Sequence, residues 1–97
     1  QNTLPQSPLL HSNFPNPFNP NTLLRYDLPQ SGMVNISIHD MTGRKIKTLV
    51  NSAQSAGYKT IQWNGTDDNN KSVSAGLYLY TIQTGNFTQT KKMVLLK

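Results

Sequence analysis

The stretch Met-Val-Asn-Ile-Ser-Ile-His at residues 33–39 carries the clearest structural signal in the chain. Its large apolar residues Val34, Ile36 and Ile38 alternate with polar residues. Because successive side chains of a β-strand point to opposite faces, this alternation predicts a strand that is buried on one face only. The fold is therefore expected to contain a sheet with one buried and one exposed face.

Similar short segments lie on both sides of this stretch, and residues that favour turns separate them. The expected strands are residues 22–28, 33–39, 45–50, 58–63, 77–84 and 87–96. Residues 45–50 form a short, more polar segment whose lysines suit an edge strand. Turn signals recur roughly every ten residues, which favours an all-β fold, an immunoglobulin-like antiparallel β-sandwich of about seven strands.

Three aromatic residues are candidates for the core of this sandwich. Trp63 suits the tryptophan that fills the core from a middle strand. Tyr78 and Tyr80, near the start of a late strand, suit a tyrosine corner, in which a phenol bonds to nearby backbone. The chain contains no cysteine, so the Cys…Trp…Cys spacing of antibody domains is absent and only the looser immunoglobulin-like class is predicted.

A proline-rich stretch, Asn-Phe-Pro-Asn-Pro-Phe-Asn-Pro-Asn-Thr at residues 13–22, leads into the first of these predicted strands. Proline fixes φ, removes a hydrogen-bond donor and biases the preceding residue toward extended backbone. The stretch is therefore expected to be stiff and extended, with Phe14 and Phe18 anchoring it to the sandwich. This interpretation makes residues 1–12 an accessible linker and residues 13–97 the folded domain.

Length and composition narrow the class of protein. A chain of 97 residues makes one domain with one modest core. The formal net charge is +5, but the basic residues are scattered rather than clustered, so nucleic acid is not an expected partner. No apolar run approaches the ~20 residues that span a bilayer, and no signal peptide opens the chain. If the domain is exported, the sequence is expected to be a fragment whose signal lay upstream.

The sequence offers little for catalysis or cofactor binding. Its two histidines, His11 and His39, lie in no recognisable catalytic motif, so neither an enzymatic activity nor a cofactor is expected. The loop around Asp67 is rich in oxygen-bearing side chains, and Asp67 and Asn69 have the alternate spacing of calcium ligands. Lys71 occupies the next alternate place and no glutamate completes the set. Turn stabilisation by side chains is the competing interpretation.

Aromatic side chains could also stack against sugar rings. The available platforms are Tyr58, Trp63, Tyr78 and Tyr80. Tyrosine and tryptophan commonly fill small β cores, so core packing is expected to account for most of them.

Six short motifs occur in a characteristic order. They are Asn-Phe-Pro-Asn-Pro-Phe-Asn-Pro at 13–20, Thr-Gly-Arg-Lys-Ile at 42–46, Ala-Gly-Tyr at 56–58, Trp-Asn-Gly-Thr-Asp at 63–67, Ser-Ala-Gly-Leu-Tyr-Leu-Tyr at 74–80 and Thr-Lys-Lys-Met-Val-Leu-Leu-Lys at 90–97. In this order and spacing, residues 13–97 closely resemble the type A C-terminal sorting domain of the type IX secretion system of Bacteroidetes and relatives. They are also similar to the immunoglobulin-like domain of flagellar hook-capping proteins.

The resemblance implies an address rather than a catalyst. Sorting domains stand at the C-terminus of a secreted cargo protein and direct it, after export to the periplasm, through the outer membrane to the cell surface or medium. The implied partners are the translocon, shuttle and sortase proteins of the outer membrane and the upstream cargo domain. A surface sortase typically removes the domain, here within residues 1–13. Carried over by motif, the recognition residues are Pro15, Asn16, Pro17, Phe18, Gly43, Arg44, Lys91, Lys92, Met93, Val94, Leu95, Leu96 and Lys97.

Physical chemistry gives the last of these motifs two roles. A terminal strand can be recognised by strand addition, and its flanking lysines could meet anionic groups on a partner. The same run could simply be the last core strand, with lysines that protect an edge. The alternative function is an immunoglobulin-like structural or interaction module of a larger extracellular protein, hook-cap-like or carbohydrate-binding. A sorting domain must end its protein, as Lys97 suggests, whereas an internal module would continue past it.

Overall fold

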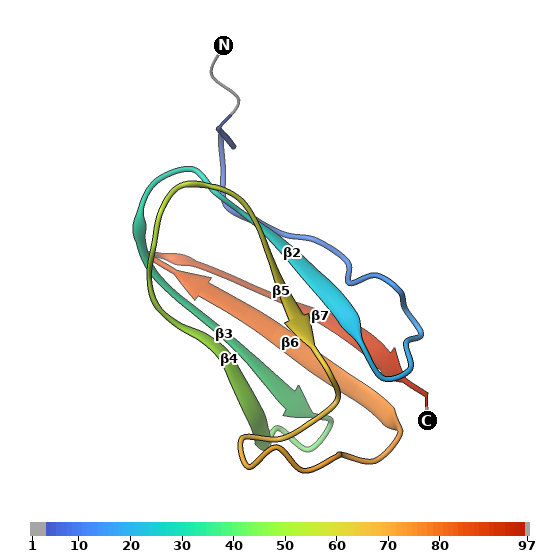
Figure 1. Cartoon of the computed structure of the whole chain (residues 1–97). Coiled ribbons are helices and arrows are strands. Elements are labelled where there is room, and N and C mark those ends of the chain that lie inside the picture. Colours follow the sequence, from blue (N-terminus) through green and yellow to red (C-terminus); the bar gives the residue numbers. More distant parts are fainter. Residues whose placement is uncertain (1–3, 97) are drawn as a thin grey trace.

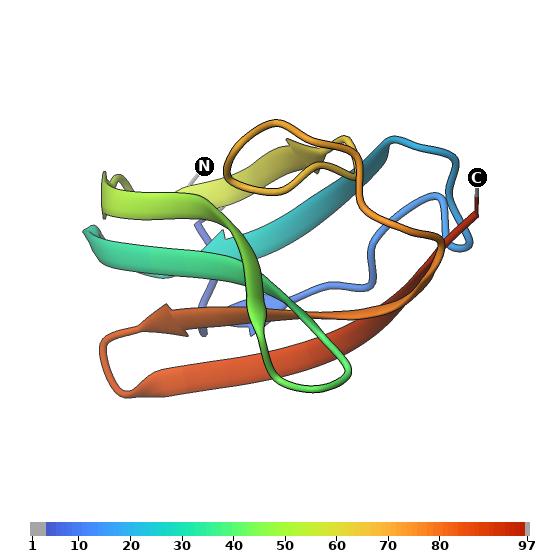
Figure 2. The same cartoon turned by 90° about the horizontal axis from the view of Figure 1, so that it is seen from below.

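Seven β-strands form two packed sheets in the computed structural model, which describes residues 4–96 (Figures 1 and 2). The strands are β1 (Leu9–Leu10), β2 (Thr22–Leu28), β3 (Gly32–Asp40), β4 (Lys45–Gln54), β5 (Gly57–Trp63), β6 (Gly76–Thr84) and β7 (Phe87–Leu95). One sheet has the strand order β1-β2-β5 and the other β4-β3-β6-β7, and all of these pairs are antiparallel. The predicted all-β sandwich of about seven strands is confirmed.

The larger sheet is built from two hairpins, β3–β4 and β6–β7, that join through β3 and β6. The β3–β4 turn contains Gly43 at a φ of +91°, where an L side chain would be strained. Asp40 accepts hydrogen bonds from Thr42 and from the backbone amide of Arg44. The bond from the Thr42 hydroxyl is the main cause that lowers the pKa of Asp40. The carboxylate therefore stabilises the turn that the glycine permits.

β4 is an edge strand, as its lysines predict, but it continues to Gln54 rather than ending at Val50. Two register shifts in the β3–β4 pair, at Ile36/Ser37 and Ile38/His39, bend it along its length. The additional residues are three polar residues and Ala53, and they are largely exposed. An edge strand tolerates them because its outer side needs no apolar partner.

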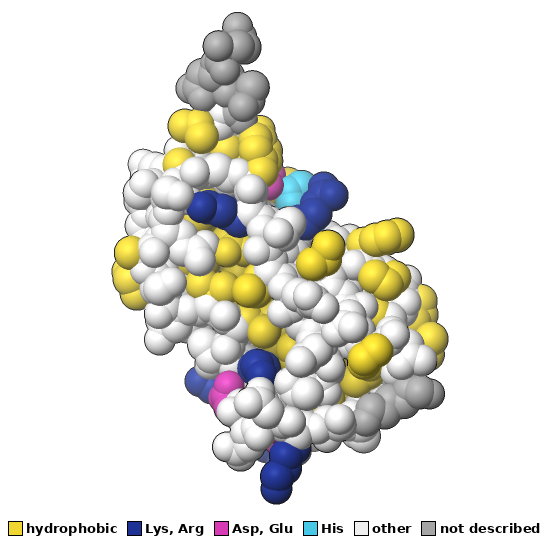
Figure 3. Space-filling model, viewed as in Figure 1, with side chains coloured by type: hydrophobic (Ala, Val, Ile, Leu, Met, Phe, Trp, Pro, Cys, Tyr) yellow, Lys and Arg dark blue, Asp and Glu magenta, His cyan; other side chains and the backbone are white. Residues whose placement is uncertain are grey.

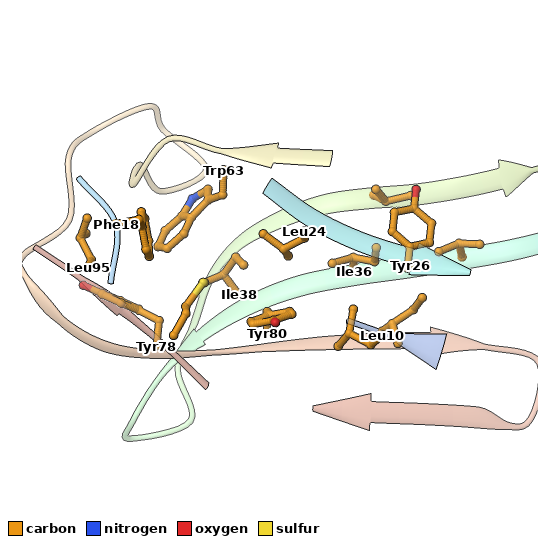
Figure 4. Close-up of a cluster of buried hydrophobic side chains, with 14 of the residues drawn as sticks. Leu10, Phe18, Leu24, Tyr26, Ile36, Ile38, Trp63, Tyr78, Tyr80 and Leu95 are labelled. Carbon is orange, nitrogen blue, oxygen red and sulfur yellow. The ribbon is translucent and has the colours of Figure 1, made fainter. Parts of the chain in front are cut away.

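The core lies between the two sheets and follows the predicted alternation. Its buried residues include Leu24, Tyr26, Leu28, Val34, Ile36, Ile38, Trp63, Tyr78, Tyr80, Ile82, Met93 and Leu95 (Figure 4). Trp63 is fully buried, and its ring centroid lies 5.7 Å from that of Phe18 and 5.4 Å from that of Tyr78. The tryptophan therefore fills one end of the core, as the sequence predicts.

The two predicted corner tyrosines have different roles. The Tyr78 hydroxyl donates to the carbonyl of Ser74 at 2.6 Å, which is the local bond of a tyrosine corner. The Tyr80 hydroxyl instead donates to the carbonyl of His11 and accepts from the amide of Asn13, both at 2.8 Å. Tyr80 therefore ties the N-terminal part of the chain to the sandwich, and only Tyr78 fits the corner prediction.

Part of the range expected to be an accessible linker, residues 1–12, is packed into the fold. Leu9–Leu10 form β1 and pair with β2, and the Leu10 side chain is completely buried. The Leu10 amide also donates to Oε1 of Gln89 on β7 at 2.9 Å. That edge of β2 would otherwise be unpaired, and β1 covers it near the end of the strand, at Tyr26 and Asp27. The chain then follows the side of the sandwich between β2 and β7 (Figures 1 and 2).

Replacing Tyr80 by phenylalanine should change how stability depends on alkaline pH. Burial raises the pKa of Tyr80 from 10.0 to about 12. Above pH 10 the phenol therefore ionises in the unfolded chain first, so its stabilisation is complete below about pH 10 and is lost as pH rises toward 12. At neutral pH the variant loses about 1–2 kcal/mol because the His11 carbonyl and Asn13 amide lose their partner.

Urea unfolding between about pH 9 and about pH 12 measures this effect. Stability should fall less steeply with pH in the Tyr80→Phe protein than in the parent. Burial also raises the pKa of Tyr26. Because this tyrosine remains in both proteins, its contribution to the pH dependence is the same in each. Identical pH dependence in the two proteins would contradict the assignment to Tyr80.

Candidate functional site

The proline-rich segment and the C-terminal strand, far apart in sequence, lie against each other. The Val94 amide donates to Oδ1 of Asn16 at 3.0 Å, and the Phe18 amide donates to the Val94 carbonyl at 3.0 Å. The Leu96 amide then donates to the Phe18 carbonyl at 2.7 Å. These contacts of residues 16–18 with residues 94–96, here called the terminal junction, cover the outer edge of β7 near its end.

Only one of the two phenylalanines anchors the junction. Phe18 is 1% exposed and packs beside Trp63, whereas Phe14 is 76% exposed (Figure 4). The prediction that Phe14 anchors the segment is therefore wrong. Its backbone pairs with Leu23, whose side chain is on the solvent face of β2. Directly opposite residues of an antiparallel pair point to the same face, so the pairing that orders Phe14 also exposes its ring.

The rest of the proline-rich segment presents a surface. Pro15, Asn16 and Pro17 are exposed, and Asn13 is buried. The Asn13 side-chain amide donates to Oγ1 of Thr22 at 3.0 Å and to the Pro15 carbonyl at 3.2 Å. The buried Asn13 amide therefore holds the segment in place. Of its predicted recognition residues, Pro15, Asn16 and Pro17 are accessible, whereas Phe18 is buried.

Gly65 supports the junction, a role that sequence reasoning missed. Its φ is +73°, and a Cβ at this position would lie 3.4 Å from the Pro20 carbonyl oxygen and 3.5 Å from a Leu95 methyl carbon. The neighbouring Trp63 ring nitrogen donates to the Thr66 carbonyl at 2.9 Å. The two Cβ distances are ordinary van der Waals contacts, so it is the positive φ that favours glycine here. The Trp-Asn-Gly-Thr-Asp motif therefore supports the end of β7 at Leu95.

The predicted recognition residues of the C-terminal tail, residues 91–97, differ in how far they are buried. Met93 and Leu95 are core residues, whereas Lys92 and Leu96 are exposed. Lys91 and Val94 are half-buried. Lys97 lies outside the described residues. The run is therefore both the last core strand and an accessible surface, which accommodates both roles considered for it.

The exposed side of the tail continues onto β6. Leu77 is directly opposite Val94, and Leu79 is directly opposite Lys92. With Leu96, these residues form an apolar surface beside a cation, here called the terminal patch (Leu77, Leu79, Lys92, Val94 and Leu96). The two β6 leucines were missed as site residues. The short turn at residues 84–87 fixes the hairpin register and could have revealed them.

Gly43 and Arg44 lie at the same end of the sandwich as the tail, in the separate β3–β4 turn (Figure 1). Arg44 is largely exposed, and its Nε lies 3.4 Å from a carboxylate oxygen of Asp40. These two residues are accessible, and their described contacts belong to their own turn.

The loop proposed for calcium is organised around a lysine. Oδ1 of Asp67 accepts from the amides of Asn69 and Lys71 at 2.9 and 3.0 Å, and the Lys71 bond is the main cause that lowers the Asp67 pKa. The Lys47 ammonium donates to Oγ1 of Thr66, the Asp67 carbonyl and Oδ1 of Asn70 at 3.2–3.3 Å. An ammonium group already satisfies these oxygens, so the geometry gives no support to a calcium site at Asp67 and Asn69.

Within the described residues, no group of three or more histidine, cysteine, aspartate or glutamate side chains could hold a metal ion. The same part of the chain contains no helix long and apolar enough to cross a membrane.

Comparison with solved structures finds the same fold in two settings. Dimeric latent PorU from Porphyromonas gingivalis superposes with a TM-score of 0.70 and 20% identity, over 93% of this chain and 9% of its own. PorZ from the same organism, a surface component of the type-IX secretion system, gives 0.59 and 14% over 93% and 11%. The hook-capping protein FlgD from Xanthomonas campestris gives 0.59 and 30% over 77% and 55%.

The chain thus spans about a tenth of PorU and PorZ and just over half of FlgD. No curated protein matches its sequence. A family model, the FlgD Ig-like domain, matches residues 21–87, from the start of β2 to the start of β7. This match covers most of the sandwich, and the chain belongs to the FlgD Ig-like domain family.

Proposed function

We propose that this domain is a C-terminal sorting domain of the type IX secretion system. It directs an upstream cargo protein through the periplasm and outer membrane to the cell surface or medium, where a sortase removes it. The observation that carries the proposal is the terminal junction, with the terminal patch beside it. Two of the segments that resemble sorting-domain motifs, at opposite ends of the sequence, bond directly to each other.

The extent of the structural matches supports this proposal. The family model starts at Asn21 and stops at Phe87, so it omits residues 13–20 of the proline-rich stretch and all of residues 91–97. PorU and PorZ each match 93% of the 97 residues, or about 90, which must include part of these flanking segments. FlgD matches only 77% of the chain. The alkylpurine DNA glycosylase AlkC from Pseudomonas fluorescens also matches 91% of the chain, so this wide coverage includes the type IX proteins but is not confined to them.

The terminal patch suits recognition by side chains. Backbone groups of Val94 and Leu96 are already bonded to residues 16–18, so strand addition at this point would first have to displace the proline-rich segment. The apolar side chains and the Lys92 ammonium need no such rearrangement. They would dock on an apolar surface of a translocon or shuttle protein that also carries anionic groups.

A secretion assay tests the proposal. Residues 1–97 are fused to the C-terminus of a periplasmic reporter in a host with this secretion system, and reporter in the medium and periplasm is measured. We expect the parent fusion to be exported and a Lys92→Glu/Leu96→Ser fusion to remain largely in the periplasm. Both side chains are exposed, so the variant should keep its fold.

A matched control carries the same changes elsewhere, Lys45→Glu and Leu23→Ser, also at exposed positions. It should be exported like the parent. If the parent itself stays in the periplasm, the sorting function is wrong. If the Lys92/Leu96 variant is exported as efficiently as the parent, the terminal patch is not the recognition surface. Thermal unfolding of the purified domains excludes loss of fold as the cause.

The family match favours a second candidate, an immunoglobulin-like structural or interaction module similar to that of FlgD in a larger protein. The same assay separates the candidates, because such a module does not cause export of a reporter.

A further inference from the structure

The solvent face of the smaller sheet contains a hollow of about 320 Å³ that the proposed sorting function does not use. Its lining comes from three neighbouring segments: the chain just after β1, β2 and β5. The terminal junction and patch contribute no residue to it. Of the four aromatic platforms suggested by the sequence, Trp63, Tyr78 and Tyr80 are in the core, and only Tyr58 is exposed.

Strand register places the groups that line this hollow. Asp27 is directly opposite Tyr58, and Arg25 is directly opposite Thr60. The His11 amide bonds to the Arg25 carbonyl at 2.9 Å, which brings His11 alongside the same pair. The Tyr58 ring therefore lies on the same face of the sheet as the hydrogen-bonding side chains of His11, Arg25, Asp27 and Thr60.

The charges in the hollow are unequally satisfied. Asp27 is largely covered and accepts from Nε2 of His11 at 2.9 Å. The Arg25 side chain is exposed, and its guanidinium has no ion-pair partner within the described part of the chain. Figure 3 shows a histidine beside basic side chains on this face. An unpaired guanidinium favours an anionic group, and its planar fork fits a carboxylate.

The ring beside this cation narrows the class of ligand. Tyr58 is 65% exposed, so one face of its phenol can receive a flat, partly apolar ring. The Thr60 hydroxyl and Asp27 carboxylate can bond to hydroxyl groups around such a ring. A hollow of about 320 Å³ has the size of a small-ligand pocket, whereas a protein interface covers a much larger surface.

We propose that the hollow binds a carboxylate-bearing saccharide, with the sugar ring against Tyr58 and its carboxylate on Arg25. Thr60 and the His11–Asp27 pair bond to the ring hydroxyls. This binding is independent of export, because the site is on the opposite sheet from the terminal patch.

The test is a titration of the ¹⁵N-labelled domain with trigalacturonic acid, followed by amide chemical shifts. We expect saturable shifts at Arg25, Tyr58 and Thr60. Maltotriose, which lacks the carboxylate, and sodium acetate, which lacks the ring, should bind much more weakly. Tyr58→Ala and Arg25→Gln should each weaken trigalacturonate binding by about tenfold or more. Phe14→Ala removes another exposed aromatic side chain and should leave the affinity unchanged.

Three outcomes would overturn the proposal. The first is an absence of saturable shifts in the hollow, including shifts confined to another surface. The second is equal binding of acetate or maltotriose, which would indicate an unspecific anion or a neutral-sugar site. The third is full affinity in the Tyr58→Ala or Arg25→Gln protein with its thermal unfolding unchanged. An acidic peptide that produces the same shifts more strongly than the saccharide would assign the hollow to a protein partner.

Discussion

Replacing Phe18 by alanine is expected to lower the free energy of unfolding by about 3–5 kcal/mol, the usual cost for a buried phenylalanine. Phe18 is 1% exposed, its ring packs against Trp63, and its backbone holds both Val94 and Leu96. Loss of the ring leaves a cavity between the core and the tail. Because domains of this size have only about 5–15 kcal/mol of stability, the variant should be close to unfolding at 37 °C.

The matched control lies four residues earlier in the same motif. Phe14→Ala removes the same side chain from a 76% exposed position and should change stability by less than about 0.5 kcal/mol. Urea unfolding of both variants measures the difference. Hydrogen exchange adds a local readout, because the Leu96 amide bonds to the Phe18 carbonyl and should exchange faster only in the Phe18 variant. Similar losses in the two variants would contradict the assignment of Phe18 as the sole anchor of the pair.

Removal of the Leu95 side chain is the second large effect. Leu95→Ala should cost about 2–5 kcal/mol, whereas Leu96→Ala at the next position should cost less than about 0.5 kcal/mol. Leu95 is 1% exposed and contacts the support at Gly65, and Leu96 is 49% exposed on the terminal patch. The alternation of a strand thus gives adjacent leucines opposite roles.

Thermal and urea unfolding check this pair, and the secretion assay extends it. Leu95→Ala should lose export through loss of fold, and Leu96 variants should lose it with the fold intact. Equal stability losses in the two variants would show that the strand face is assigned incorrectly. Deletion of residues 91–97 removes Met93 and Leu95 from the core, so truncation cannot separate recognition from folding. Single exposed substitutions in the tail are therefore the informative variants.

Much of the fold could be predicted because its signals are local. Alternation in residues 33–39 identifies the buried face of β3, and the same pattern identifies the buried faces of β2 and β6. Gly43 marks its turn because positive φ excludes most side chains. These features depend on neighbours within a few residues, so the amino-acid order alone contains them.

The site required contacts between distant parts of the chain. Phe14 and Phe18 each precede or follow a proline in nearly identical surroundings, and only pairing with Leu23 and Val94 makes one exposed and the other buried. Leu77 joins Val94 through the register of a hairpin. Likewise, the Lys47 ammonium bonds to the loop about twenty residues away that contains the calcium candidates Asp67 and Asn69.

The sequence by itself determined that this protein is an all-β sandwich and which residues of β2, β3 and β6 face its core. Only the tertiary structure decided that β1 belongs to the sandwich, that Phe18 alone anchors the proline-rich segment, and that this segment covers the end of β7. The physical reason is that periodicity specifies the face of each strand, whereas the partner of a strand edge depends on which distant segment can bond to it.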